Sequence, residues 1–158
     1  NALIAMYNDK KISGFDNGPD SRFAYFYNDF GFVPATTDIK ASSHGSDFSY
    51  ESILSVDPEV LVIVDRTVSD LDVIKKDIEN AIIKQTRAYK EGKIVYLDGV
   101  NWYFSANGVT TEMAKLDEIL NELKYIDTGK ACQDTGVPFH IVIRGYIHVC
   151  TNSQMDSN

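Results

Sequence analysis

Residues 60–64 read VLVIV, a continuous apolar and mostly β-branched run that ends at Asp65 and Arg66. A strand that is apolar at every position must be covered on both faces, which is typical of a central strand in a parallel sheet. Residues 94–97 (IVYL) form a second run of this kind before Asp98. Because parallel strands need a long crossover between them, the two runs predict an α/β fold.

The segments around these strands have the apolar spacing of helices. After Ser69, apolar residues recur at intervals of three and four as far as residue 82, and Ser69 with Asp72 resembles a capping box. Residues 110–124 place Met113 and three leucines on one face, which predicts a longer helix. Shorter helices are expected at residues 22–30, 49–55 and 85–90.

Two further patterns lie near the N-terminus. Residues 2–7 and 12–15 are short apolar runs separated by a polar turn, which predicts a β-hairpin. The expected helix at 22–30 follows Asp20 and Ser21, either of which suits an N-cap, and ends at Gly31.

These elements predict a Rossmann-like three-layer lobe with a mainly parallel central sheet and no internal repeat. We assign this lobe to residues 1–124. Residues 125–158 follow a helix at which the domain can end, and form an unassigned C-terminal tail. Within the tail, alternating apolar residues predict a strand at 137–149, and the Ser/Asn-rich end is expected to be disordered.

Charge and motifs exclude several functional classes. The net charge is −8 and the pI is about 4.7, which argues against binding to nucleic acid. The cysteines and histidines form neither a CxxC nor an HExxH pattern, so a zinc site has no support. For Cys132 and Cys150, a disulfide and two free thiols both remain open. An unrelated small α/β enzyme is an alternative, although GxGxxG, GxxxxGK[ST] and GxSxG are all absent.

Ligands of open α/β sheets bind beyond the carboxyl ends of the strands. Arg66 directly follows the first buried strand, whereas Trp102 and Tyr103 follow the second, so a guanidinium and a phenol are expected on one rim. The alternatives are an ion pair of Arg66 with Asp65 or a neighbour, and loop aromatics packed on the domain edge.

Several short strings, taken in order, resemble the C-terminal lobe of catecholate-siderophore-binding proteins, whose two α/β lobes are joined by a rigid helix. The strings are SRF at residues 21–23, SSHG at 42–45, SYE at 49–51, VDR at 64–66, KIVYLD at 93–98 and WY at 102–103. The likeness covers about residues 1 to 124, and the residues from 125 onwards have no counterpart in it. Three explanations of these residues remain open: an extension out of frame, an artefact of cloning, or a strand added to the sheet edge.

The resemblance implies roles for individual residues. Arg22 and Arg66 match cleft arginines that pair with the negatively charged ferric complex, and Trp102 is expected to contact the ligand beside them. His44 and Tyr103 match residues that complete the iron coordination when a siderophore supplies only four donors. An exposed histidine without a ligand role is the alternative for His44.

The resemblance also implies partners and a cellular location for the protein. Glu51 matches an acidic residue that docks onto the permease of an ABC importer. The expected cargo is iron(III) as a siderophore complex, with no permanently bound cofactor and no catalysis, and the N-terminal lobe supplies the other half of the cleft. Such proteins are extracytoplasmic, in the periplasm or lipid-anchored outside the cytoplasmic membrane, with the anchor outside this sequence. A haem- or corrinoid-binding lobe of the same transporter class is the alternative.

Overall fold

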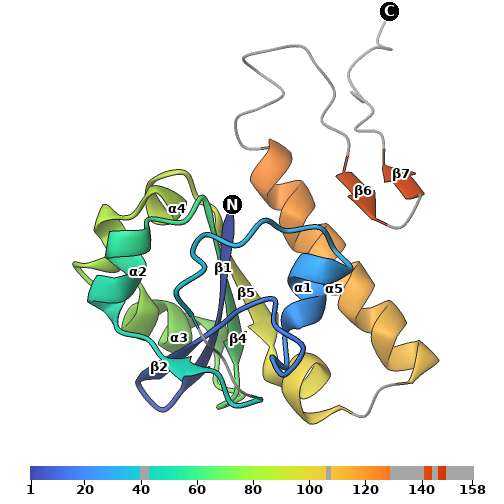
Figure 1. Cartoon of the computed structure of the whole chain (residues 1–158), viewed down its shortest axis with the longest axis horizontal. Coiled ribbons are helices and arrows are strands. Elements are labelled where there is room, and N and C mark those ends of the chain that lie inside the picture. The colour runs from blue at the N-terminus through green and yellow to red at the C-terminus, as the bar shows by residue number, and fades with distance from the viewer. Residues whose placement is uncertain (40–42, 106–107, 129–140, 144–145, 149–158) are drawn as a thin grey trace, which may run out of the picture.

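The computed structural model describes residues 1–39, 43–105, 108–128, 141–143 and 146–148 of the 158-residue chain. At its centre is a five-stranded sheet in the order β3-β2-β1-β4-β5. The strands are β1 (Ala2–Asn8), β2 (Lys11–Phe15), β3 (Ser46–Asp47), β4 (Val60–Asp65) and β5 (Ile94–Asp98). β1, β4 and β5 run parallel, whereas β2 and β3 add antiparallel pairs at one edge, as Figure 1 lets the reader follow.

The predicted hairpin is confirmed as β1 and β2, closed by the pair Asn8 and Lys11. Asp9 and Lys10 connect the strands with φ angles of 48° and 65°. Positive φ at both central residues is the geometry of a type I′ turn, whose twist matches that of the strands. This turn lies at the same end of β1 as the carboxyl ends of β4 and β5.

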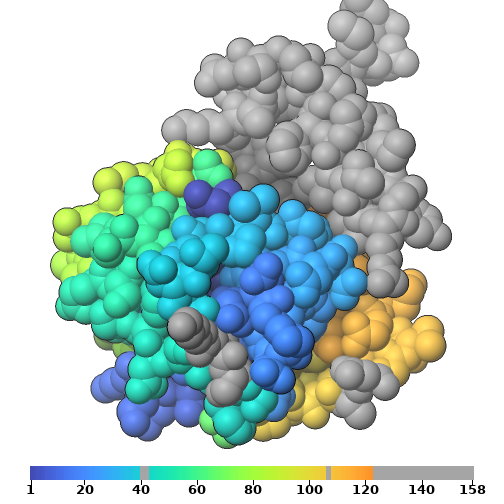
Figure 2. Space-filling view, in the orientation of Figure 1, coloured from blue at the N-terminus to red at the C-terminus, as the bar shows by residue number. Residues whose placement is uncertain are grey.

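Helices cover both faces of the sheet, which gives three layers (Figure 1). The helical segments are α1 (Ala24–Asn28), α2 (Tyr50–Val56), α3 (Leu71–Ile78), η1 (Ile83–Gln85), α4 (Arg87–Lys90), η2 (Val100–Phe104) and α5 (Val109–Thr128). Side chains of α1, η2 and α5 pack on one face, and those of α2, α3, η1 and α4 on the other. In Figure 2 the blue residues of α1 lie at the front between the green α2 and the orange α5. The α/β fold with a mainly parallel centre is therefore confirmed.

The N-caps of two helices differ from the prediction. α1 begins at Ala24 after Phe23, because Ser21 accepts a backbone hydrogen bond from Ala24 in a preceding turn and caps nothing with its side chain. α3 has Asp70 as its N-cap without a side-chain bond, so the predicted capping box of Ser69 is wrong. The backbone amide of Ser69 instead donates to the carboxylate of Asp65, at the end of β4, over a distance of 2.8 Å.

The buried face of α5 is also different from the predicted one. Met113, placed on the apolar face by its spacing, is 57% exposed, whereas Ile119 is 1% exposed and belongs to the core. Lys115 is 5% exposed, and its ammonium pairs with the half-exposed Glu112. The aliphatic stem of a lysine can cover apolar surface, and the ion pair with Glu112 compensates its charge at this buried position.

Two short strands follow α5: β6 (Ile141–Ile143) and β7 (Tyr146–His148), which pair antiparallel. They fall inside the predicted strand at 137–149, whose remaining residues lie outside the described part of the chain. The same holds for Cys132, Cys150 and the Ser/Asn-rich end. None of the helices in the described ranges is both long and apolar enough to span a membrane.

Candidate functional site: a basic, aromatic edge of the sheet

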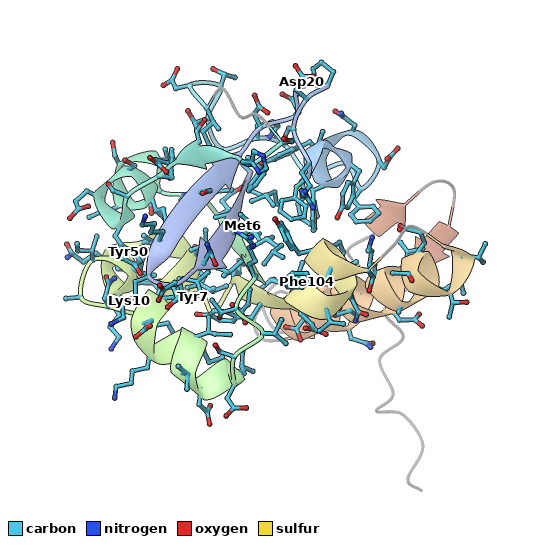
Figure 3. All side chains as sticks on the ribbon, turned by 90° about the horizontal axis from the view of Figure 1, so that it is seen from below. Met6, Tyr7, Lys10, Asp20, Tyr50 and Phe104 are labelled. Carbon is cyan, nitrogen blue, oxygen red and sulfur yellow. The ribbon has the colours of Figure 1, made fainter. Side chains whose placement is uncertain are left out.

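The three parallel strands end side by side. In their register Tyr7 is level with Asp65, and Asp65 is level with Asp98. Figure 3 looks from below onto this edge, with Met6 near the end of β1, Phe104 of η2 to one side, and Tyr7, Lys10 and Tyr50 to the other. The loops beyond β4 and β5 therefore start from neighbouring points.

Two arginines and one tyrosine meet at this edge. The guanidinium carbon of Arg22 lies over the Tyr103 ring, 4.4 Å from its centroid, and that of Arg66 lies 4.8 Å from the same centroid. Phe104 packs edge-on against Tyr103, with centroids 4.9 Å apart, and is 59% exposed. A guanidinium within about 6 Å of a ring centroid is attracted by the ring's negative face. The structure thus brings three of the residues predicted for the site into one group.

The loop that carries Arg66 is held by a buried carboxylate. Asp65 is 5% exposed, and its Oδ1 accepts hydrogen bonds from the Thr67 amide at 2.9 Å and the Thr67 hydroxyl at 2.6 Å. Its Oδ2 accepts from the Ser69 amide at 2.8 Å. Both Asp65 oxygens are engaged inside this turn, so the alternative of an ion pair between Asp65 and Arg66 does not hold.

The turn after β4 also contains backbone strain. Val68 has φ of 52°, in the left-handed region that β-branched residues avoid. Such a conformation costs on the order of 1–3 kcal/mol and persists only where neighbouring contacts enforce it. The bonds from Asp65 to the residues on either side of Val68 provide this enforcement.

The segment that carries Tyr103 is η2, a π-helical turn, a geometry that is frequent at functional sites. Glu118 of α5 accepts from the Asp98 amide at 2.7 Å, from the Trp102 indole at 2.8 Å and from the Asn101 side chain at 3.4 Å. The Ser105 hydroxyl donates to the Val100 carbonyl at 2.6 Å and closes the turn.

Trp102 itself faces the interior, unlike Tyr103. Its surface is 4% exposed, and its ring stacks on Phe26 with centroids 5.0 Å apart and on Tyr25 at 6.2 Å. The structure therefore does not bring the indole to the exposed group of Arg22, Arg66 and Tyr103.

Gly99 allows the two loops to approach. A Cβ atom at this position would lie 1.8 Å from the Asp65 carbonyl oxygen and 3.3 Å from the Arg66 Cα. No side chain fits at that distance, so a glycine is required directly after β5, where the chain lies against the end of β4.

Arg22 also contacts the turn that contains His44. Its Nε donates to the Ser43 carbonyl at 3.3 Å, which links the arginine to residues 43–44. The turn is fixed from its other side by the pairing of β3 with β2 and by Gly45, which has φ of 79°. The place for a Gly45 Cβ lies only 2.9 Å from the Phe15 ring, so this glycine is also required. His44 is exposed beside this contact.

Glu51 lies away from this group, in the first turn of α2, where it is exposed. The N-cap is Ser49, whose hydroxyl accepts from the Ser52 amide at 3.1 Å. An acid in the first turn is favoured by the helix dipole, independently of any partner.

The charges around the site leave its cations without carboxylate partners. Among the residues described, the ion pairs are Asn1–Glu59, Arg87–Glu59, Lys93–Glu91 and Lys115–Glu112, and none involves Arg22 or Arg66. Within the same residues, no group of three or more His, Cys, Asp and Glu side chains is placed to hold a metal ion. The edge is therefore suited to an anion rather than to a bare cation.

A separate cavity of about 410 Å³ lies along β5, between α3 and α5. It is lined by Leu71, Lys75, Glu79, Tyr89, Gly92, Ile94, Tyr96 and Glu122. Burial, together with the charge of Glu118, raises the pKa of Glu122, which Lys75 partly offsets. Within the cavity, Lys75 already lies over the Tyr96 ring and the Tyr96 hydroxyl donates to Glu79.

Sequence reasoning missed Glu118, Gly99 and the supporting role of Asp65. Asp65 was noted only as a neighbour of Arg66, and Glu118 lies in a helix whose apolar face alone was considered. The glycine directly after a buried strand is a signal for close backbone approach, and it was available in the sequence.

Comparison with known proteins adds independent information. Residues 1–100 match a family model described as "Periplasmic binding protein". The petrobactin-binding protein YclQ of Bacillus subtilis is 37% identical over 126 residues, which are 78% of this chain and 39% of that protein. The ferric-anguibactin-binding protein FatB of Vibrio anguillarum is 34% identical over 122 residues, 75% of this chain and 37% of that protein.

Solved structures agree with this result. The crystal structure of YclQ matches with a TM-score of 0.69 and 38% identity, covering 78% of this chain and 44% of that one. The periplasmic catecholate-siderophore binding protein VctP from Vibrio cholerae matches with a TM-score of 0.68 and 35% identity, covering 77% and 44%. The chain thus spans less than half the length of these relatives.

Proposed function

The chain belongs to the periplasmic binding protein family, and on this premise we propose that it captures an iron(III)–catecholate siderophore complex for an ABC importer. The relatives YclQ and FatB are named for binding petrobactin and ferric anguibactin, and VctP for binding catecholate siderophores. Family members bind ligands rather than transform them, so the site has to recognise its cargo and release it, without a chemical step.

The observation that carries the proposal is the placement of two guanidinium groups over one phenol ring. The chain has a net charge of −8, so two arginines that form no ion pair with the carboxylates of the described residues are a local exception. Ferric catecholate complexes are anionic, and guanidinium groups donate to their oxygens in fixed geometry, with charge-assisted hydrogen bonds. The aromatic surface of Tyr103 and Phe104 suits flat catechol rings.

Tyr103 and His44 are proposed as donors to the iron of the cargo when the siderophore supplies only four oxygens. Iron(III) prefers hard anionic oxygen, which a phenolate supplies, and an imidazole is an acceptable sixth donor. The contact of Arg22 with Ser43 places the turn of His44 beside the arginine that also covers Tyr103. Trp102 supports the site from the core side rather than from its surface.

The partners follow from the same assignment. We place the lobe at residues 1–124, with residues 125–158 as an extra tail. The second half of the cleft comes from an N-terminal lobe, in line with the greater length of the relatives. The family is extracytoplasmic, and we propose the periplasm or a lipid anchor on the outer face of the cytoplasmic membrane. Glu51, exposed at the start of α2, is the proposed contact to the permease.

A titration of the chain with a synthetic ferric tris-catecholate tests the function. Binding is followed by quenching of Trp102, the single tryptophan, and by the iron–catecholate charge-transfer band. We expect Arg22→Ala and Arg66→Ala each to weaken binding by about 2 kcal/mol, because each removes a charge-assisted partner.

The matched control is Lys76→Ala, which removes one positive charge from the exposed side of α3. This variant has the same net charge as each arginine variant, and it should bind the ferric catecholate with wild-type affinity. Equal affinities for all four proteins would refute the assignment of the cleft. Saturable binding of haem with a Soret band, without binding of the ferric catecholate, would assign a different cargo.

A further inference from the structure

Each loop of the site is supported by one carboxylate that does not itself lie in the group of Arg22, Arg66 and Tyr103. Asp65 accepts three hydrogen bonds from the loop of Arg66, two from Thr67 and one from Ser69. Glu118 accepts three from the segment of Tyr103, including the backbone amide of Asp98. The two carboxylates come from different elements, the end of β4 and the middle of α5.

The site needs such support because its own charges oppose it. Arg22 and Arg66 both lie within 5 Å of the Tyr103 ring centroid, and their like charges repel each other. The strained backbone of Val68 shows that the loop of Arg66 does not adopt its lowest-energy shape. The attraction of the Tyr103 ring for each guanidinium opposes this repulsion, and the hydrogen bonds of the two carboxylates add support from outside the three site residues.

We propose that Asp65 and Glu118 are positioning residues, which set Arg66 and Tyr103 in their binding geometry before an anionic ligand enters. This inference rests on the proposed function for its ligand, a ferric catecholate. Preorganisation increases affinity because the loops and side chains lose little conformational entropy when the ligand binds. The carboxylates act through hydrogen bonds to their loops and do not touch the ligand.

The sign of the effect on affinity separates positioning from simple electrostatics. Removing a negative charge near an anion site strengthens anion binding when only Coulomb forces change. The isosteric changes Asp65→Asn and Glu118→Gln remove that charge, but each places an amide donor where the carboxylate accepts. If these residues position the loops, the affinity falls instead of rising.

The first experiment needs no ligand. In ¹⁵N-labelled chain, the side-chain N–H signals of the four arginines and of the single tryptophan are followed by NMR. Tyr103→Leu identifies the arginine signals that experience its ring current. Asp65→Asn should move the Arg66 signal towards that of a free arginine and leave the Arg22 signal unchanged. Glu118→Gln should move the Trp102 indole signal and both arginine signals, because Tyr103 itself shifts.

The second experiment measures the affinity for the synthetic ferric tris-catecholate. We expect each isosteric variant to bind about tenfold more weakly than the wild type. Asp72→Asn in α3 and Asp117→Asn in α5 are the controls, since each removes an exposed carboxylate and should bind as the wild type does or slightly better.

Milder variants keep the test valid if Asp65→Asn does not fold. Thr67→Val removes the hydroxyl that donates to Asp65 and also contacts the Ser69 hydroxyl, so it should shift the Arg66 signal partly. Thr67→Ser retains the hydroxyl and should restore the signal. Unchanged arginine and indole signals, or affinities equal to or above the wild type, would overturn the inference. If the wild type binds no ferric catecholate, the proposed function fails, while the NMR signals still decide whether the carboxylates position the loops.

Discussion

Tyr103 is the residue on which the site converges. Arg22 comes from the loop before α1, Arg66 from the end of β4 and Tyr103 from η2, and both guanidinium groups lie over the one ring. This arrangement depends on a few atoms: the two oxygens of Asp65, the carboxylate of Glu118 and the absent side chain of Gly99.

Gly99→Ala should destabilise the chain by about 3 kcal/mol, because its methyl group would overlap the backbone of Asp65. Urea unfolding followed by circular dichroism measures the change. Gly108→Ala is the matched control, since a Cβ there meets nothing within 4 Å, and should change stability by less than about 0.5 kcal/mol. Equal effects of the two substitutions would argue against the close approach of Gly99 to the backbone of Asp65.

Tyr103→Phe should distinguish two kinds of cargo. A ferric bis-catecholate leaves iron positions open, so the loss of the phenol oxygen should weaken its binding about tenfold and shift its absorption band. A ferric tris-catecholate is already six-coordinate and should bind with affinity within about twofold of the wild type. Absorbance titrations with both complexes measure the difference, and equal losses would make Tyr103 a packing residue only.

At the scale of elements, tyrosine hydroxyls connect the sheet to its surroundings. Tyr27 of the α1 helix accepts from the Ile4 amide of β1 at 3.2 Å and donates to the Phe15 carbonyl of β2 at 2.9 Å. Tyr7 at the end of β1 donates to Asp77 of α3 at 2.6 Å. These bonds connect a helix on each face of the sheet to the hairpin of β1 and β2.

The same tyrosines predict a loss of stability in alkali. Burial raises the pKa of Tyr27 to about 12, and burial with the hydrogen bond to Asp77 raises that of Tyr7 to about 12. Below the ordinary tyrosine pKa, near 10, both phenols are protonated in the folded and the unfolded chain, and neither makes stability depend on pH. Above it the unfolded chain loses the protons first, so the free energy of unfolding falls, by up to about 1.4 kcal/mol per pH unit and group.

Urea unfolding at about pH 9 and about pH 11.5 measures this fall. Tyr27→Phe is less stable at the lower pH because it lacks two hydrogen bonds, but its stability should depend less steeply on pH. An identical slope for the variant and the wild type would show that Tyr27 does not titrate with unfolding.

At the scale of the molecule, two apolar layers cover the faces of the sheet, and the candidate site lies at the carboxyl ends of its parallel strands. The face of α1, η2 and α5 contains most of the aromatic core, including Phe15, Phe23, Phe26 and Trp102. The other face is mainly aliphatic. Since η2 is part of the aromatic layer, the position of Tyr103 is connected to the packing of the whole lobe through its neighbour Trp102.

The chain by itself should bind more weakly than a full-length relative. It spans less than half the length of VctP, and a ligand held on one side keeps part of its surface in water. Parallel titrations of this chain and VctP with the same ferric tris-catecholate should give affinities that differ by about a hundredfold or more. Comparable affinities would mean that the edge of Arg22, Arg66 and Tyr103 is a complete site.

The sequence alone determined the order of the elements and the rim that Arg66 and Tyr103 share. The apolar runs at 60–64 and 94–97 and the hairpin appear as predicted, because periodicity and turn chemistry act over a few residues. The carboxyl ends of adjacent parallel strands lie at the same edge of a sheet, so the sequence already predicts Arg66 and Tyr103 on one rim. The starts of α1 and α3 and the buried face of α5 were predicted incorrectly, because tertiary contacts decide among several acceptable caps and faces.

The tertiary structure alone decided which side chains meet. The contact of Arg22 with both Ser43 and Tyr103 joins segments far apart in the chain, and no local pattern specifies it. The orientations of neighbours also differ: Trp102 enters the core and Tyr103 reaches the edge, because η2 is a π-helical turn bound to Glu118. Local spacing selects the residues for the rim, whereas packing and buried hydrogen bonds between distant elements determine where their side chains lie.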